Sequence, residues 1–266
     1  MNNASIRAHL SLTLVTLVAA AGCGTQLSPA VVQVSGRAME LVETGSGPAT
    51  VVFEAGFGND WSCWDEIASA VAKDARVFAY SRPGYGQSAP TTDPRDAAHI
   101  VEGLRSLLQA RGYAPPYVLV GHSFGGTYME LFAKSYPAEV AGLVLVDPRH
   151  RDFTSTCEGQ GFTGCGIPAE AVATLPPVQI AEYQAFAQSA AEIASAGSFG
   201  TYPVRVLTAE VHGFAPAVES LWVSMLAKLA EEAKDGDQIL FHGANHNLEL
   251  NHAAEVAKVI VGLLPR

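Results

Sequence analysis

The chain of 266 residues has few charged side chains, and the basic ones are the scarcer kind. Charged residues make up 16% of it, with 16 lysines and arginines against 26 aspartates and glutamates, so the net charge is −10. No cluster of basic residues interrupts this acidic balance. We therefore expect no nucleic-acid partner, because phosphate backbones bind to positively charged surfaces.

The motifs of metal and dinucleotide binding are missing as well. The four cysteines form no C-x-x-C pair, and histidines and cysteines lack the spacing of a metal site. No G-x-G-x-x-G follows the first buried strand pattern, which argues against a dinucleotide-binding enzyme. We therefore expect neither a metal ion nor an organic cofactor.

The N-terminal segment has no apolar run long enough for a permanent membrane helix. Its run over residues 10–21 follows a polar start and ends in small residues, which is typical of an export signal. The sequence Ala20-Ala21-Gly22-Cys23 resembles the lipobox of bacterial lipoproteins, in which the cysteine is lipidated and becomes the mature N-terminus. An ordinary secretory signal cut nearby is the alternative.

If the N-terminal segment is an export signal, the chain has three parts. Residues 1–23 are expected to be a signal peptide, residues 24–30 a tether, and residues 31–266 the folded domain. The protein would then be exported, either to the bacterial cell envelope, anchored at the membrane through lipidated Cys23, or as a secreted protein. Since export implies an oxidising compartment, we expect a disulfide between Cys157 and Cys165, with Cys63 a buried free thiol.

The domain alternates between strand and helix patterns. Such alternation predicts a mostly parallel eight-stranded sheet with helices on both faces. The rhythm breaks over 149–200, where no strand pattern occurs, and an insertion of this length predicts a cap or lid. The expected strands are 31–35, 37–42, 50–54, 76–80, 117–120, 142–146, 204–208 and 238–242, and the expected helices are 61–73, 94–111, 126–136, 215–233 and 252–264.

One stretch carries a nucleophile motif. The apolar residues 117–120 lead into Gly121-His122-Ser123-Phe124-Gly125, and a helical pattern follows at once. Strand, G-x-S-x-G turn and helix in this order predict a nucleophile elbow, in which a strained serine needs glycine neighbours. The turn raises the Ser123 hydroxyl above the sheet edge and directs backbone N–H groups at a developing oxyanion.

Three further segments extend this pattern into a resemblance to the α/β-hydrolase fold over roughly residues 35–264. Glu54–Gly58 stands where that family has its His-Gly-x-Gly oxyanion loop, with alanine and glycine in place of the His-Gly pair. Residues 80–88 resemble its Asp-x-Pro-Gly-x-Gly-x-Ser loop, with serine in place of the aspartate, and residues 241–246 resemble its final strand and Gly-x-x-His turn. The resemblance implies a catalytic triad in the order serine, acid, histidine.

His246 is the expected general base, because it follows the last strand. We expect His122 to line the elbow, His242 to lie within a strand, and the remaining histidines to be solvated or to belong to the cap: His99, His150, His212 and His252.

The triad acid has two candidates. Asp147 ends the sixth strand and is favoured, whereas Glu210 is the only carboxylate at the turn after the seventh strand, where the family commonly has its aspartate and this chain has His212 nearby.

The remaining site residues follow from the same resemblance. The backbone N–H groups of Phe57 and Phe124 are the expected oxyanion hole. Their side chains, Trp61 and apolar cap residues are expected to line an acyl or alcohol pocket, and the sequence has no signal of a charged group there.

We therefore predict a serine hydrolase that acts on a small-molecule ester through an acyl-Ser123 intermediate. An acyltransferase or a proline-type aminopeptidase of the same fold is an alternative, and so is a non-catalytic binding protein that keeps the hydrolase shell.

Overall fold

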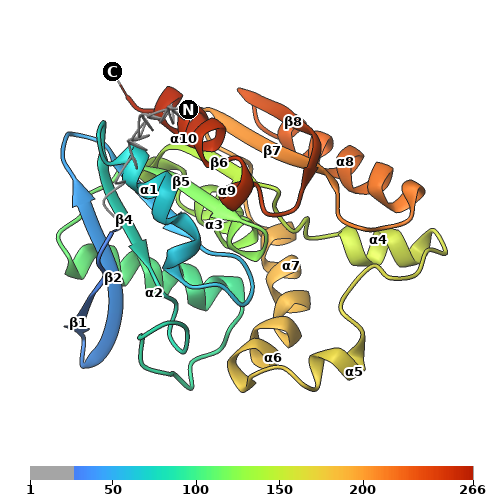
Figure 1. Ribbon diagram of the computed structural model, residues 1–266, viewed down its shortest axis with the longest axis horizontal. Coiled ribbons are helices and arrows are strands. Elements are labelled where there is room, and N and C mark those ends of the chain that lie inside the picture. The colour runs from blue at the N-terminus through green and yellow to red at the C-terminus, as the bar shows by residue number, and fades with distance from the viewer. Residues whose placement is uncertain (1–26, 266) are drawn as a thin grey trace, which may run out of the picture.

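An eight-stranded sheet forms the centre of the protein, whose computed structural model describes residues 27–265 (Figure 1). The predicted signal peptide, Cys23 and the first part of the predicted tether lie outside the described residues. Across the sheet, the strands follow the order β1 (Ala30–Val34), β2 (Arg37–Gly45), β4 (Arg76–Tyr80), β3 (Thr50–Glu54), β5 (Tyr117–His122), β6 (Val140–Val146), β7 (Val204–Val211) and β8 (Gly236–Asn245).

The prediction of a mostly parallel sheet is confirmed. β1 and β2 form an antiparallel hairpin at one edge, β2 pairs with β4 antiparallel, and all later pairs are parallel. The residues of β3 and β5 are buried along their whole length, as continuous apolar strands covered on both faces must be.

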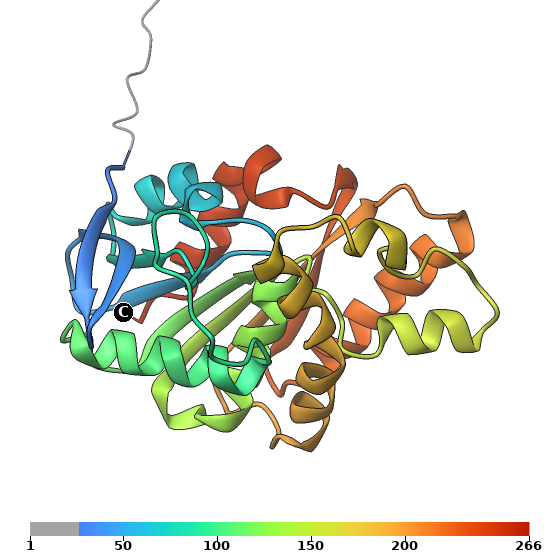
Figure 2. The same cartoon turned by 90° about the horizontal axis from the view of Figure 1, so that it is seen from below.

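Helices cover both faces of the sheet (Figure 2). One face packs against the 3-10 helix η1 (Trp61–Trp64) and helices α1 (Asp65–Val71), α9 (Leu248–Asn251) and α10 (Ala253–Gly262), and the other against α2 (Ala97–Ala110), α3 (Phe124–Ser135) and α8 (Pro216–Glu231). A short 3-10 turn, η2 (Pro137–Glu139), precedes β6. The fold is therefore three layers with an apolar core on each side of the sheet.

Two predicted helix starts differ from the structure by three residues or more. The segment predicted as one helix over 61–73 begins as the 3-10 helix η1 and becomes α-helical only at Asp65. The helix predicted from Pro94 begins at Ala97, because the Asp96 side chain caps it by accepting a hydrogen bond from the His99 N–H at 3.2 Å.

The cap, residues 149–200, lies between β6 and β7 and is helical: α4 (Phe153–Gly159), α5 (Ala169–Val172), α6 (Pro177–Gln184) and α7 (Phe186–Ser195) (Figure 1). α7 packs against α2 and α3, so the cap rests on the core at the ends of the parallel strands. Cys157 and Cys165 are joined in a disulfide, as predicted, while the free Cys63 is half-buried rather than buried. Within residues 27–265, no helix is long and apolar enough to span a membrane.

Candidate active site

Parallel pairing brings four separate turns together at one edge of the sheet. Glu54 of β3 is paired with Gly121 of β5, and His122 of β5 with Val146 of β6. Since neighbouring parallel strands end at the same edge, the turns after β3, β5 and β6 adjoin one another, and β8 brings a fourth turn to the same edge. These turns contain Phe57, Ser123, Asp147 and His246.

The turn after β5 is a strained elbow at Ser123. This serine has φ 51° and ψ −119°, a backbone conformation that non-glycine residues rarely adopt. A Cβ on Gly121 would lie 2.4 Å from the Gly125 carbonyl oxygen, and one on Gly125 would lie 2.3 Å from the Glu54 carbonyl oxygen. Glycine is therefore required on both sides of Ser123, as the motif predicts.

The Ser123 hydroxyl is in hydrogen-bond contact with a histidine that is itself bound to a buried aspartate. The distance from Ser123 Oγ to His246 Nε2 is 3.0 Å, and that from His246 Nδ1 to Asp147 Oδ2 is 2.6 Å. The order and geometry of nucleophile, base and acid are those of a serine-hydrolase triad. The structure thus brings together the three side chains that the sequence indicates.

Asp147 is fully buried and accepts four hydrogen bonds. Its Oδ1 accepts from the Ala209 N–H and the Trp222 indole N–H, both at 3.0 Å, while its Oδ2 contacts His246 and also His212 Nε2 at 2.7 Å. Burial acts to raise the pKa of Asp147, but the hydrogen bonds from His212 and His246 outweigh it and hold that pKa well below its usual value. The carboxylate is therefore charged at any pH at which His246 can act as a base.

His212 is the functional residue that sequence reasoning placed wrongly. Instead of lying in solvent or in the cap, it sits between two carboxylates, with Nε2 on Asp147 and Nδ1 2.7 Å from Glu219 Oε2 on α8. Burial lowers the pKa of His212, but its bonds to Asp147 and Glu219 outweigh burial and raise the pKa above 6.5. The only signal in the sequence was its position near the turn where the family commonly has an aspartate.

The other acid candidate is separated from the triad. Glu210 Oε1 lies 3.1 Å from His242 Nδ1, and Glu210 Oε2 accepts the Gly243 N–H at 2.9 Å. The geometry therefore makes Asp147, and not Glu210, the partner of His246.

The remaining histidines support the fold in different ways. His122 is buried, and its ring lies against that of His246 with centroids 4.7 Å apart and Nε2 3.0 Å from the His246 carbonyl oxygen. Burial lowers the pKa of His122 to about 3, so it is neutral and donates this bond. His150 lies in the cap, as expected, and is buried there, with its Nδ1 accepting the Asp152 N–H. His99 and His252 lie on the surface of the core.

The predicted oxyanion hole has two unused backbone donors. Neither the Phe57 N–H nor the Phe124 N–H has an acceptor within residues 27–265. A Cβ on Gly56 would lie 3.4 Å from Ser123 Cβ and 2.8 Å from His122 Nδ1, so the loop after β3 lies directly against the elbow.

Arg82 fixes the orientation of this loop. Its guanidinium donates to the Ala55 carbonyl at 2.6 Å and to the Gly56 carbonyl at 2.9 Å. Because the Gly56 C=O and the Phe57 N–H belong to one planar trans peptide, holding the carbonyl on one side directs the N–H to the other.

Arg82 in turn belongs to a buried network that reaches into the cap. It pairs with Glu54 at 2.7 Å and with Glu182 of α6 at 2.8 Å, and Glu182 also pairs with Arg95 at 2.6 Å. All four side chains are almost completely buried, so one network of buried ion pairs connects the cap to the oxyanion loop.

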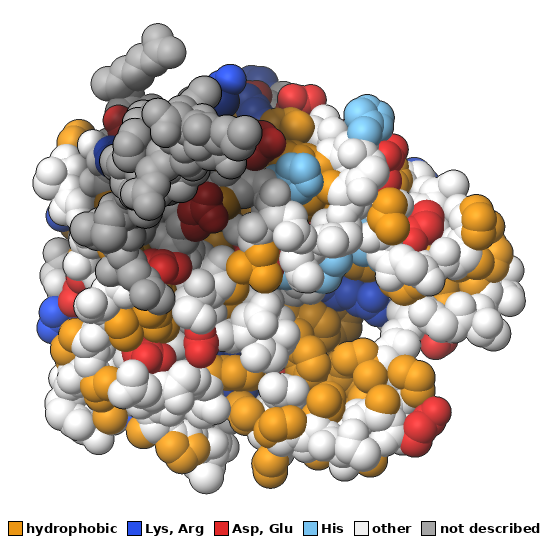
Figure 3. Space-filling view, in the orientation of Figure 1, with side chains coloured by type: hydrophobic (Ala, Val, Ile, Leu, Met, Phe, Trp, Pro, Cys, Tyr) orange, Lys and Arg blue, Asp and Glu red, His pale blue; other side chains and the backbone are white. Residues whose placement is uncertain are grey.

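A cavity of about 390 Å³ opens above Ser123 between core and cap. Phe57 and Phe124 line it as predicted, with Tyr183, Phe214 and Trp222, but Trp61 does not: it is buried in the core beneath the sheet's other face. Figure 3 shows a hollow on this side of the molecule, in which pale-blue histidine atoms and a blue basic side chain adjoin orange hydrophobic ones. The basic residue among the lining side chains is Arg149, of which the sequence shows no signal.

One group of side chains in the described part of the chain has the geometry to hold a metal ion: Asp147, His212 and His246. In this arrangement one carboxylate oxygen lies at hydrogen-bond distance from a nitrogen of each ring, so a proton on each histidine accounts for both contacts. A metal ion there would displace those protons and remove the base from Ser123. The site therefore fits proton transfer better than metal binding.

The sequence is similar to several known proteins. Residues 49–168 match the family model of the α/β hydrolase fold. The chain is 36% identical over 111 residues to the uncharacterized protein YqjL of Bacillus subtilis, which corresponds to 42% of this chain and 44% of that one. The chain thus spans less than half the length of the curated relatives it matches.

Solved structures match most of the chain at low identity. A membrane phospholipase A, described as a bacterial virulence factor, matches with a TM-score of 0.64 at 19% identity and covers 90% of this chain and 86% of its own. An epoxide hydrolase from Vigna radiata matches with a TM-score of 0.66 at 15% identity, covering 89% and 97% of the two chains. These likenesses show a shared fold. By its sheet order, the family model that matches residues 49–168 and these structural neighbours, the chain has the α/β-hydrolase fold.

Proposed function

We propose that the protein is a serine hydrolase that cleaves carboxylic esters through a covalent acyl-Ser123 intermediate. The observation that carries this proposal is the continuous contact from Ser123 Oγ to His246 at 3.0 Å and from His246 to Asp147 at 2.6 Å. A serine hydroxyl is a weak nucleophile at neutral pH and needs such a base and acid.

The site has a chemical group for each step of acyl transfer. Ser123 Oγ attacks the ester carbonyl while His246 Nε2 takes its proton, and Asp147 stabilises the imidazolium that forms. The Phe57 and Phe124 N–H groups donate hydrogen bonds to the oxyanion. His246 then gives its proton to the departing alcohol, and a water molecule attacks the acyl-enzyme by the same route.

Ester chemistry suits this cavity better than the alternatives. An aminopeptidase would need a carboxylate near the nucleophile to hold the substrate amine, and none of the residues that line the cavity is acidic. Attack of a serine on an epoxide would leave an ether, which the oxyanion hole cannot help water to cleave. A binding protein would not need the serine and histidine to remain in contact.

Hydrolysis of p-nitrophenyl esters from C2 to C12 tests the proposal. We expect the wild type to turn over part of the series and Ser123→Ala to abolish turnover. Asp147→Asn is expected to lower kcat by about 10³- to 10⁴-fold, because the base loses its tautomer and its counter-charge. Glu210→Gln is the matched control and is expected to leave kcat unchanged. A folded wild type that cleaves none of the esters would contradict the proposal.

We also propose that the protein is exported and anchored through lipidated Cys23. The lipobox-like Ala20–Cys23 supports this location, and mass spectrometry of the mature N-terminus tests it. A mature chain that starts with an unmodified residue other than Cys23 would contradict the anchor.

A further inference from the structure

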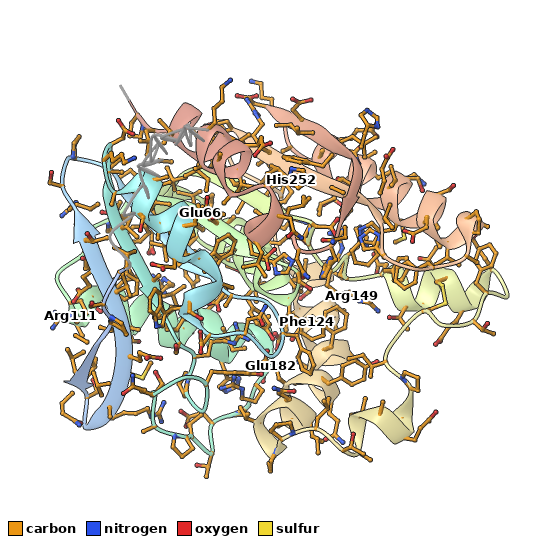
Figure 4. The ribbon with its side chains drawn as sticks, viewed as in Figure 1. Glu66, Arg111, Phe124, Arg149, Glu182 and His252 are labelled. Atoms are coloured by element: carbon orange, nitrogen blue, oxygen red, sulfur yellow. A yellow bond between two sulfur atoms is a disulfide. The ribbon has the colours of Figure 1, made fainter. Side chains whose placement is uncertain are left out.

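Arg149 is a cation that the triad chemistry does not use, although it lies in the same cavity. It follows Asp147-Pro148, is half-buried, and its backbone N–H donates to the Ser123 carbonyl at 2.9 Å. Figure 4 shows Arg149 and Phe124 near one another at the junction of sheet and cap. Its side chain is thus held beside the nucleophile.

Only one end of the guanidinium is occupied. Nη2 donates to Thr154 Oγ1 at 2.5 Å and to the Cys165 carbonyl at 2.8 Å. Nε and Nη1 have no acceptor within residues 27–265, and neither atom is sealed from solvent. Two donor groups therefore remain available toward the cavity.

The charge of Arg149 is also unmatched. In the described chain every other arginine except Arg76 forms an ion pair with a carboxylate, and the chain has an excess of acidic residues from which such a partner could come. The neighbours of the Arg149 guanidinium are instead aromatic rings, with centroids 4.9 Å away for Phe153, 5.8 Å for Trp222 and 5.9 Å for Phe186.

A cation in such surroundings favours an anionic ligand. Burial lowers the pKa of Arg149 to about 10, so the guanidinium is charged at neutral pH but has lost part of its hydration. An oxyanion of the ligand would restore the missing counter-charge and accept the free N–H groups.

We propose that Arg149 binds an anionic group of the substrate, so that the preferred ester carries a carboxylate or a phosphate-type group on the part that lies in the cavity. This inference rests on the proposed ester hydrolysis for the identity of the reacting bond. The anion site itself rests on the unmatched charge and free donors of Arg149.

The competing explanation is structural: Arg149 would only fasten the disulfide loop through Thr154 and Cys165. Ligand binding to the Ser123→Ala protein distinguishes the anion-binding role from the structural one. This variant is expected not to cleave the ester, so affinity can be measured without turnover. Titration calorimetry would use monomethyl glutarate, its uncharged counterpart dimethyl glutarate, and methyl 4-phosphonobutanoate. A charged hydrogen-bonded contact predicts that at least one anionic ester binds about 10- to 100-fold more tightly than dimethyl glutarate.

Three substitutions complete the test. Arg149→Gln should remove the preference for the anion, and Arg149→Lys should keep part of it. Arg151→Gln is the control, because it removes the same charge two residues away, from a guanidinium that already pairs with Glu130 and Glu232. This variant should keep the full preference for the anionic ester. Thermal unfolding of each variant monitors the fold.

The outcomes decide the proposal. If the carboxylate or the phosphonate is the tighter ligand, that result also names the anion. If no anionic ester binds more tightly than the neutral one, or if Arg149→Gln weakens all three equally, the anion site is wrong. Anion binding by a protein whose wild type cleaves no ester would refute the proposed function and leave the site in place.

Discussion

At the scale of single residues, the unusual member of the site is Asp147, because one oxygen of its carboxylate contacts two histidines. Its Oδ2 is 2.6 Å from His246 Nδ1 and 2.7 Å from His212 Nε2, and Glu219 holds the far side of His212. A protonated His212 neutralises part of the charge that would otherwise stabilise the His246 imidazolium, and it places a second positive charge close to it. His212 is therefore a positioning residue that tunes the triad electrostatically.

This arrangement predicts a change in pH dependence for His212→Gln. The glutamine amide can still donate to Asp147 but carries no charge, so the acidic limb of the kcat/KM profile should move to higher pH by about one unit. Measured pH–rate profiles of the wild type and variant check this. Glu219→Gln changes a charge farther from His246 and should move the limb by less than His212→Gln does, and superimposable profiles for all three proteins would rule out a tuning role.

The sequence could identify the site residues that have local motifs. Ser123 follows from strand, G-x-S-x-G and helix, and His246 from the last strand and its Gly-x-x-His turn. The choice between Asp147 and Glu210 depended on which strand end faces His246 in space. His212 and Arg149 have no motif of their own, since only the packing of β7, α8 and the cap gives them their neighbours.

At the scale of elements, contact between the β3 loop and the elbow requires glycine. A Cβ on Gly125 would collide with the Glu54 carbonyl at 2.3 Å and the Ala55 carbonyl at 2.5 Å, which belong to the oxyanion loop. Gly125→Ala should displace the donors and lower kcat/KM by about 10²-fold or more, comparable to loss of an oxyanion-hole donor.

Gly103→Ala is the matched control for this steric argument. Gly103 lies in α2, and a Cβ there meets no atom within 4 Å. Alanine should leave ester hydrolysis unchanged and raise the free energy of unfolding by about 0.5–1 kcal/mol, through helix propensity. Equal loss of activity in both variants would show that the glycine contacts are not the cause.

The contact between cap and core depends on buried charges. Glu182 of α6 accepts from both Arg82 and Arg95, so Glu182→Gln leaves two buried guanidiniums with too little negative charge. We expect a loss of about 3–5 kcal/mol in the free energy of unfolding, measured by urea denaturation. Glu170→Gln, on the exposed part of the cap, should change it by less than about 0.5 kcal/mol.

The strands were easier to predict than the helix ends and the cap. Buried parallel strands are continuous apolar runs, which the sequence displays directly, whereas the start of α2 depends on one side-chain cap from Asp96. The cap helices are short and rich in alanine and polar residues, so their positions depend on the disulfide, on α2 and α3, and on the Glu182 pairs.

At the scale of the whole molecule, one buried carboxylate predicts how stability depends on pH. Glu249 of α9 is 1% exposed, its Oε2 lies 3.3 Å from His122 Nε2, which already donates to the His246 carbonyl, and burial raises its pKa from 4.5 to about 7. A pKa that is higher in the folded state means that folding is favoured when Glu249 is protonated. Its contribution is fully present below pH 4.5 and is lost as the pH rises through 7.

Glu249→Gln should therefore become more stable than the wild type as the pH rises. The difference in the free energy of unfolding should grow by about 3 kcal/mol between pH 4.5 and pH 8, because a shift of one pKa unit corresponds to about 1.4 kcal/mol. Denaturant unfolding at both pH values measures it. A difference that does not vary with pH would mean that the pKa of Glu249 is not raised in the folded protein.

The proposed chemistry depends most on Ser123 being an activated nucleophile. Reaction of the folded wild type with a fluorophosphonate, followed by peptide mass spectrometry, tests this directly and requires no knowledge of the substrate. We predict a single adduct on Ser123, slower labelling of Asp147→Asn by orders of magnitude, and no labelling of Ser123→Ala. A folded wild type that stays unlabelled, or that carries the adduct on another residue, would contradict the proposed serine hydrolase.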